Sequence, residues 1–204
     1  RGHWYYSRFE AGDEYSVHAR RVGAIDAPEQ VLLDQRERAL GHEFYDLGGF
    51  DISRNERLLA WTEDTVGRRE YTLRFRDLVT GLVLGDTITG VESQVVWTGD
   101  HRSVLYIEKD PRTLLGVRVR RHRLGTPQAE DELVYEEHDE AFYTWIDSSK
   151  DERFLLIGST STLSNELRFA RADDPSLRFQ VLLPRERDHE YEAEPFGERW
   201  IIRT

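Results

Sequence analysis

The chain has 204 residues, 38% of them hydrophobic and 11% aromatic, which is enough apolar material for the core of one globular domain. Acidic residues outnumber basic ones by 39 to 28, and the formal charge of −11 would repel a phosphate backbone, so we expect no nucleic-acid partner. Cysteine is absent and no apolar run approaches the roughly 18 residues of a membrane span. We therefore expect no disulfide, no thiolate metal site and no membrane insertion.

The amino-terminal segment reads "RGHWYYSRFE" and lacks the apolar stretch of a secretory signal peptide. The chain also contains no methionine, so we do not expect residue 1 to be a natural start. These two features predict that the sequence is an excised piece of a longer protein.

Short β-type runs begin immediately and continue along the whole chain. The first three are "HWYYSRFE" (3–10), "YSVHARRV" (15–22) and "EQVLLDQ" (29–35). Each is rich in aromatic or β-branched residues and is too short for an ordinary helix of about ten residues or more. They predict the strands of an early structural unit.

After residue 47 the same order of four strands recurs. Its most recognisable part is a polar turn followed by an apolar run, in "SRNERLLAW", "GDHRSVLYI", "SKDERFLLI" and "EPFGERWII". We align these phrases on Arg57, Ser103, Arg153 and Arg199, which gives a repeat of about 46 to 50 residues. The first strands are expected at 48–53, 94–99 and 142–148, the third strands at 71–78, 116–124 and 165–172, and the fourth strands at 85–91, 132–137 and 179–186.

Four short strands per repeat of this length are typical of a β-propeller blade, whereas a plain β-sandwich gives no reason for a fixed period. We therefore predict an all-β chain that forms part of a β-propeller. The approximate blades are 1–47, 48–93, 94–141 and 142–189, with the start of a further blade at 190–204. Trp61, Trp97, Trp145 and Trp200 fall in or beside these strands, and we expect them to pack between neighbouring blades.

The sequence contains no motif that by itself predicts catalysis. The piece nearest to the G-x-S-x-G nucleophile elbow, "GSTSTLS" (158–164), lacks the second glycine and is interpreted as a polar hairpin. "EEHDE" (136–140) lacks the spacing of a calcium loop and is expected to be a solvated turn. "RVRRHR" (118–123) is expected to be a strand with arginines on its solvent face. We therefore expect no catalytic residue, metal ligand or cofactor.

Five phrases in order resemble the oligopeptidase B branch of the prolyl oligopeptidase family of serine peptidases. They are "HEFYDLGGFDIS", "LLAWTEDTVGRREYTLRFRDLVTG", "RHRLGT", "LVYEEHDEAFYTW" and "LLPRERDHEYEAE". The resemblance implies that this chain is the amino-terminal part of a seven-bladed propeller. It also implies a carboxy-terminal α/β-hydrolase domain that supplies the catalytic serine, aspartate and histidine, so that this chain alone is inactive.

The resemblance further implies that the propeller is a size-selecting lid and gate over the active site of a peptidase that cleaves short peptides after Lys or Arg. Glu43 and Arg69 match positions tied to the interdomain latch, although without the resemblance each would be interpreted as an ordinary surface charge. Acidic stretches could steer basic peptides towards the site. The expected location is cytoplasmic, with the periplasm left open.

A second hypothesis is a free-standing β-propeller that binds protein partners and performs no catalysis. It predicts a chain that closes its ring after a few more blades, whereas the peptidase hypothesis predicts a long continuation with a G-x-S-x-G elbow. Under either hypothesis, a partial ring leaves unpaired faces and strand edges at its terminal blades. We therefore expect the isolated chain to associate with itself.

Overall fold

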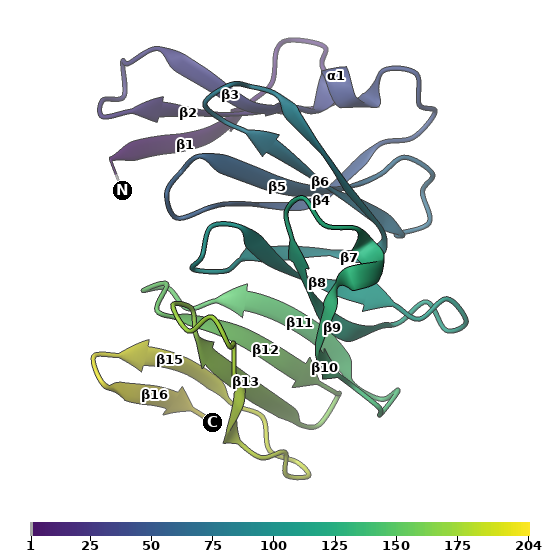
Figure 1. Cartoon of the computed structure of the whole chain (residues 1–204), viewed down its shortest axis with the longest axis vertical. Coiled ribbons are helices and arrows are strands. Elements are labelled where there is room, and N and C mark those ends of the chain that lie inside the picture. The colour runs from purple at the N-terminus through teal and green to yellow at the C-terminus, as the bar shows by residue number, and fades with distance from the viewer. Residues whose placement is uncertain (1) are drawn as a thin grey trace.

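The computed structural model describes residues 2–204 as a stack of small antiparallel sheets (Figure 1). One short α-helix, α1 (Gln35–Ala39), and one 3-10 turn (Gln128–Glu130) interrupt the strands. No helix within 2–204 is long and apolar enough to cross a membrane. The strands are β1 (His3–Arg8), β2 (Val17–Val22), β3 (Glu29–Asp34), β4 (Asp46–Ile52), β5 (Leu58–Asp64), β6 (Tyr71–Asp77), β7 (Val83–Trp97), β8 (Ser103–Lys109), β9 (Gly116–Arg123), β10 (Glu132–Glu136), β11 (Tyr143–Ser148), β12 (Phe154–Thr160), β13 (Asn165–Arg171), β14 (Gln180–Leu183), β15 (Glu192–Phe196) and β16 (Arg199–Arg203).

Neighbouring strands along the chain pair with each other, which is the meander of a propeller blade. We call β1–β3 blade 1; β4, β5, β6 and the first part of β7 blade 2; the rest of β7 with β8–β10 blade 3; β11–β14 blade 4; and β15–β16 the start of blade 5. The prediction of a partial β-propeller is confirmed.

One strand differs from the expected pattern. The predicted fourth strand at 85–91 and the next first strand at 94–99 run together as β7, which joins blades 2 and 3 into one seven-stranded sheet. The pairing of β7 with β8 shifts register between Val91 and Val95, so the chain changes blade within a continuous strand. The residue boundaries between blades therefore stay a prediction.

The second strand of each central blade contains a continuous run of four apolar residues because this part of the strand is covered on both faces. On β5, Leu59 and Trp61 face a cluster shared with blade 1, whereas Ala60 faces one shared with blade 3. On β8, Tyr106 faces blade 2 and Leu105 faces blade 4. Strands that are buried on both faces have continuous apolar runs in their sequences, which explains why "LLAW" and "VLYI" do not alternate with polar residues.

The four tryptophans named above lie in these inter-blade clusters, as predicted. Trp61 and Trp97 are buried, and Trp145 and Trp200 are partly buried between blades 4 and 5. Gly158 makes room for Trp145, because a Cβ atom there would overlap the indole ring on the paired strand. The "GG" pair has a similar role at Gly48, where a Cβ atom would lie 2.7 Å from Thr62 Oγ1 and 2.8 Å from Ser93 Cβ.

The hairpins before β5, β8 and β12 share one architecture, and it corrects the sequence alignment by one residue. A backbone N–H at the start of each turn donates across the turn, from Ser53 to Leu58, Thr98 to Ser103 and Ser149 to Phe154. The equivalent of Arg57 and Arg153 is therefore Arg102 and not Ser103. In the third strands, the registers make Leu73, Val119 and Leu167 equivalent positions.

Candidate interdomain face

The strands end on two opposite faces of the stack. We call one the α1 face, because α1 lies on it, and the other the turn face, because it carries the hairpins before β5, β8 and β12 (Figure 1). Ion pairs join neighbouring loops of the α1 face. Arg36 of α1 pairs with Asp13, Arg112 pairs with Glu140, and Arg185 pairs with Glu137. The α1 face consists of the loops 9–16, 35–45, 65–70, 110–115, 137–142, 161–164 and 184–191.

Glu43 and Arg69, the two residues of the expected latch, both lie on the α1 face. Glu43 is in the loop between α1 and β4, Arg69 is in the loop between β5 and β6, and both are exposed. The two loops touch, because a Cβ atom on Gly67 would lie 3.5 Å from the ring of Phe44. Within residues 2–204, neither charged side chain forms an ion pair or a hydrogen bond.

The loop that carries Arg69 is held from both sides. The buried carboxylate of Asp64 accepts hydrogen bonds from the backbone N–H groups of Val66, Gly67 and Arg69, at 2.7 to 2.9 Å. Burial would raise the pKa of Asp64, but these backbone donors hold it below its ordinary value. Lys109 of blade 3 donates from Nζ to the Arg69 carbonyl at 2.5 Å. Arg69 itself has a φ of 54°, a left-handed conformation that costs energy for a residue with a Cβ.

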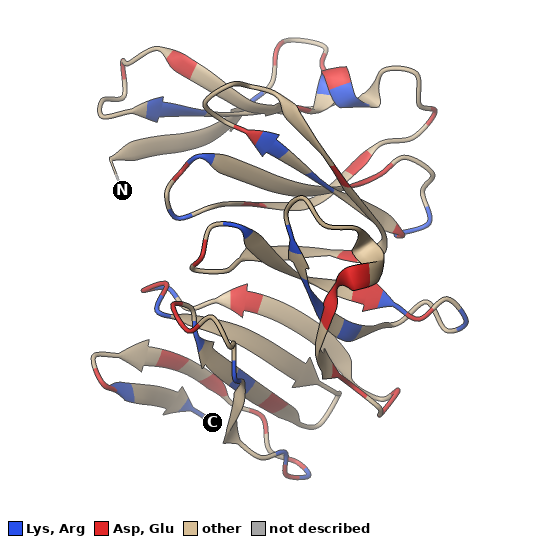
Figure 2. Cartoon of the chain, viewed as in Figure 1, with Lys and Arg blue, Asp and Glu red and all other residues tan. Residues whose placement is uncertain are grey.

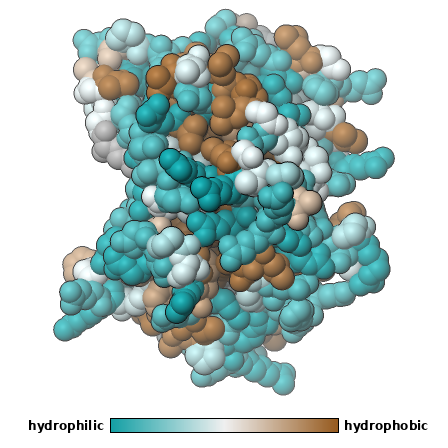
Figure 3. All heavy atoms as spheres, in the orientation of Figure 1, coloured by the Kyte–Doolittle hydropathy of each residue, from teal (hydrophilic) through white to brown (hydrophobic). Residues whose placement is uncertain are grey.

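Exposed apolar side chains surround the two charges. Leu40 is 77% exposed, Val66 66% and Phe44 41%. In the space-filling view, hydrophobic spheres reach the upper right margin, the side on which α1 lies in Figure 1 (Figure 3). Apolar side chains mixed with charged ones that lack partners are the composition of a protein–protein contact surface.

A buried ion pair attaches α1, and therefore the Glu43 loop, to blade 2. Glu63 of β5 is 2% exposed, and its carboxylate accepts from Arg38 of α1 at 2.6 and 3.0 Å. Arg74 of β6, the Trp61 indole N–H and the Tyr45 hydroxyl also donate to this carboxylate, at 2.5, 3.0 and 3.3 Å. Burial favours the neutral acid, but these donors lower the pKa of Glu63. Glu63 could not be singled out from the sequence, because its arginine partners lie 25 and 11 residues away along the chain.

The "EEHDE" segment only partly matches the predicted solvated turn. His138, Asp139 and Glu140 are exposed, but Glu137 is 7% exposed. Its carboxylate accepts from Arg185 at 2.6 Å and from Tyr135 at 2.7 Å, and the Arg185 guanidinium lies 3.9 Å from the Phe142 ring centroid. Glu137 thus connects blades 3 and 4 on the α1 face.

The arginines of "RVRRHR" lie on strand β9, as predicted, but they do not simply face solvent. Arg118 pairs with Glu108 and Glu136, Arg120 pairs with Glu108, and Arg121 pairs with Asp100. Figure 2 shows the same mixing of basic and acidic segments along the strands and loops. The stretch is therefore a structural ladder of charges rather than a basic patch.

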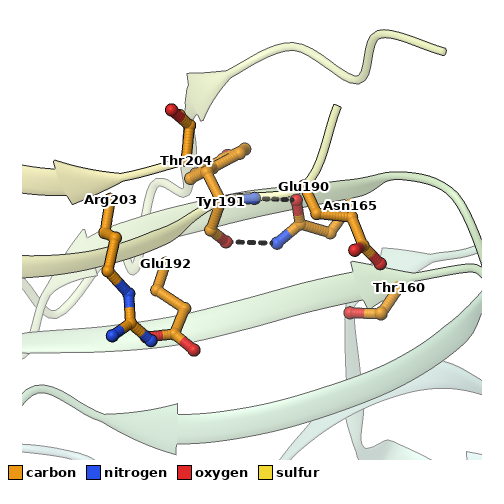
Figure 4. A pocket seen from close by; sticks show the side chains of 7 residues that line it. All are labelled: Thr160, Asn165, Glu190, Tyr191, Glu192, Arg203 and Thr204. Atoms are coloured by element: carbon orange, nitrogen blue, oxygen red, sulfur yellow. Dashed lines mark hydrogen bonds and ion pairs between the residues drawn. The ribbon is translucent and has the colours of Figure 1, made fainter. Parts of the chain in front are cut away.

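A pocket of about 370 Å³ opens between blade 4 and the start of blade 5 (Figure 4). Asn165 closes one side by two hydrogen bonds to the backbone of Tyr191, at 2.6 and 2.9 Å. Glu192 and Arg203, which line the other side, pair with each other at 2.6 Å. The side chains of Asn165, Glu192 and Arg203 thus already have partners within the chain, and no hydroxyl among the residues that line this pocket is hydrogen-bonded to a basic side chain.

A serine hydroxyl beside a histidine nitrogen would be the starting geometry for acyl-transfer catalysis. Ser16 Oγ lies 3.3 Å from His18 Nε2, but that nitrogen also contacts Gln35 at 2.9 Å, and Ser16 is buried. Burial lowers the pKa of His18. The hairpin predicted at 158–164 is present as the connection between β12 and β13. No group of three or more His, Asp or Glu residues within 2–204 could hold a metal ion.

The stacked antiparallel blades define this chain as part of a β-propeller. Its whole length, residues 1–204, matches the family model described as "Prolyl oligopeptidase, N-terminal beta-propeller domain". The chain therefore belongs to this family of propeller domains, and the resemblance inferred from the sequence phrases is confirmed.

Individual relatives agree with the family. The chain is 48% identical to dipeptidyl aminopeptidase BI of Pseudoxanthomonas mexicana, covering 100% of this chain and 30% of that protein, and 28% identical to Protease 2 of Moraxella lacunata, covering 98% and 30%. The solved structure of oligopeptidase B from Leishmania major superposes with a TM-score of 0.91 at 27% identity, covering 98% of this chain and 29% of that one. The chain thus spans less than a third of the length of these relatives.

Proposed function

We propose that this propeller is the gating portion of a serine peptidase of the prolyl oligopeptidase family. In this proposal the α1 face docks on a carboxy-terminal α/β-hydrolase domain and restricts access to its active site to short peptides. The observation that supports it best is the composition of the α1 face. There, Leu40, Phe44 and Val66 are exposed beside two opposite charges that lack partners within residues 2–204.

Glu43 and Arg69 would contribute to a breakable interdomain latch. A carboxylate and a guanidinium each form strong charge-assisted hydrogen bonds with an opposite partner, and such bonds reform easily after opening. The Arg69 loop is suited to this role because Asp64 and Lys109 fix its backbone, so little order would be lost when its side chain binds.

The latch can be tested in the full-length protein with Glu43→Ala and Arg69→Ala. Matched controls are Glu132→Ala on the outer strand β10 and Arg102→Ala on the turn face, both exposed. Loss of an exposed ion pair is worth up to about 1 kcal/mol, so we expect the kcat/KM for a short peptide to change by about two- to fivefold, with a weaker salt dependence. The controls should behave as the parent. If all four variants behaved alike, Glu43 and Arg69 would be ordinary surface charges without a role in a latch.

For the substrate, we propose short peptides cleaved after Lys or Arg. The formal charge of −11 would raise the local concentration of basic peptides near the propeller. A second candidate is the release of dipeptides from a free amino end, which is favoured by the 48% identity to a protein named a dipeptidyl aminopeptidase.

Two fluorogenic substrates separate these candidates in the full-length protein: Gly-Arg with a free amine and Arg-Arg with a blocked amine, each carrying the same leaving group. Hydrolysis of both would support endopeptidase action after a basic residue. Hydrolysis of the free-amine substrate alone would support dipeptide release. If neither is hydrolysed, nor any other short peptide, the free-standing interaction propeller becomes the better account.

A further inference from the structure

A buried histidine on the other side of the molecule lies in a contact that the proposed function does not use. His122 of β9 is fully buried, and both of its ring nitrogens lie against carboxylates. Nδ1 is 2.8 Å from Asp131 Oδ1, and Nε2 is 3.2 Å from Asp86 Oδ1. The Phe75 ring stacks on the imidazole, with the ring centroids 5.7 Å apart and an interplanar angle of 25°.

The two carboxylates come from different blades. Asp86 lies on the part of β7 that belongs to blade 2, whereas Asp131 lies just before β10 of blade 3. His122 itself is on β9 of blade 3, so the ring connects the two blades near the turn-face end of their shared apolar cluster. The loop before Asp131 also contacts blade 2 through Gln128, whose side-chain amide accepts from the Thr89 N–H at 3.1 Å and donates to the Thr89 carbonyl at 3.0 Å.

The surroundings supply hydrogen-bond donors to both carboxylates. Tyr106 of β8 donates its hydroxyl to Asp131 Oδ2 at 2.8 Å, and the Gly125 backbone N–H donates to Asp86 Oδ1 at 2.5 Å. Arg120 of β9 donates to the Asp131 carbonyl at 3.1 Å. Asp86, Asp131, Tyr106 and Arg120 are the titratable groups that residues 2–204 place against the imidazole or its two carboxylates.

Only a protonated imidazole can satisfy this arrangement. Imidazolium donates from both nitrogens, whereas either neutral tautomer would turn a lone pair towards one of the two carboxylates. Loss of the proton would thus replace one hydrogen bond by a repulsive contact inside the fold, where such mismatches are costly.

We propose that His122 is a buried imidazolium that locks blade 2 to blade 3, and that its deprotonation at alkaline pH loosens the turn-face end of this blade interface. Burial alone would lower the pKa of His122, but the bonds to Asp131 and Asp86 raise it above the ordinary value of 6.5. A raised pKa means that the stabilisation is fully present below pH 6.5 and is lost as the pH rises through the pKa of the folded state.

The test is hydrogen–deuterium exchange of the segment 120–126 in the full-length protein between pH 6 and 9, corrected for the intrinsic rate. This segment contains the Gly125 amide that donates to Asp86. For the parent, protection should be constant below pH 6.5, fall by up to about tenfold per pH unit between 6.5 and the pKa of His122 in the folded state, and level off above that pKa. His138→Gln, a change in an exposed histidine on the α1 face, should reproduce the parent profile.

Two variants at the lock make the result decisive. His122→Gln should have low protection at every pH, because an amide cannot hold both carboxylates as a cation does. Asp86→Asn keeps an acceptor of the same size but no charge, so its pH dependence should be smaller and centred at lower pH. A pH-independent parent profile, or an unchanged pH dependence in Asp86→Asn, would overturn the proposal.

Discussion

At the scale of single residues, buried carboxylates with several donors fix the α1 face. Glu137 and Glu63 each sit on one blade and accept from an arginine on another element. Removal of one partner from such a pair leaves a buried charge uncompensated, which costs more than the pair contributes as a whole. The Glu43 loop of the proposed latch therefore depends on Glu63 for its position, and the loop 137–142 depends on Glu137.

Glu137→Gln tests this dependence through pH. Burial would raise the pKa of Glu137, but Arg185 and Tyr135 lower it to about 2. Because the pKa is lowered, its contribution is fully present above the ordinary value of 4.5 and is lost as the pH falls towards 2. The variant should lose about 3 kcal/mol of unfolding free energy at pH 7 by urea titration, and much less at pH 3.

The matched control for Glu137 is Glu140→Gln, because Glu140 pairs with Arg112 and both side chains are exposed. Its loss should stay below about 1 kcal/mol at either pH. A Glu137→Gln variant with a pH-independent loss would show that the carboxylate charge does not hold Arg185.

At the scale of elements, the turn-face hairpins are the most regular feature of the chain. In each one a Ser or Thr hydroxyl donates to an Asn or Asp two residues later: Ser53 to Asn55, Thr98 to Asp100 and Ser149 to Asp151. The following residue has a positive φ at Glu56, His101 and Glu152. Side-chain acceptors here replace the bonds that the turning backbone cannot make.

The hairpin before β8 allows a comparison within the protein itself. Asp100 accepts from the backbone N–H groups of Arg102 and Ser103 at 2.8 and 2.9 Å. We expect Asp100→Ala to lower the unfolding free energy by about 2 kcal/mol, because these donors lose their acceptor. Asp100→Asn should lose less than half as much, since Asn55 does the same work in blade 2. Equal losses in the two variants would show that the charge, not the turn geometry, matters.

At the scale of the whole molecule, the strand order could be predicted because each second strand is buried on both faces and repeats at one period. The partners of the buried charged residues could not be predicted from the sequence. Glu63, His122 and Glu137 find partners in other strands or blades, and no local pattern marks a polar residue as buried. The one-residue error in the repeat alignment at Ser103 has the same cause. Backbone hydrogen bonds across the turn decide which residues are equivalent, and these bonds cannot be recognised in the sequence.

The terminal blades of the isolated chain expose apolar side chains, including Trp4 on β1 and Phe196 and Ile201 near the other end. We expect the purified chain Arg1–Thr204 to associate at tens of micromolar in light scattering, because uncovered blade faces bind one another. Ile201→Lys should weaken the association more than Leu133→Lys, which changes an exposed leucine on the outer strand β10. A monodisperse monomer would contradict this expectation.

In the proposed gating role, this propeller limits the size of the peptides that reach a hydrolase active site. This role is tested most directly by competition in the full-length protein between a peptide of about ten residues and one of about sixty that contains the same cleavage sequence in an unstructured context. If the propeller is a gate, the short peptide should be cleaved rapidly while the long one stays intact. Cleavage of both at the same rate would contradict the gating role, even if the protein is a peptidase.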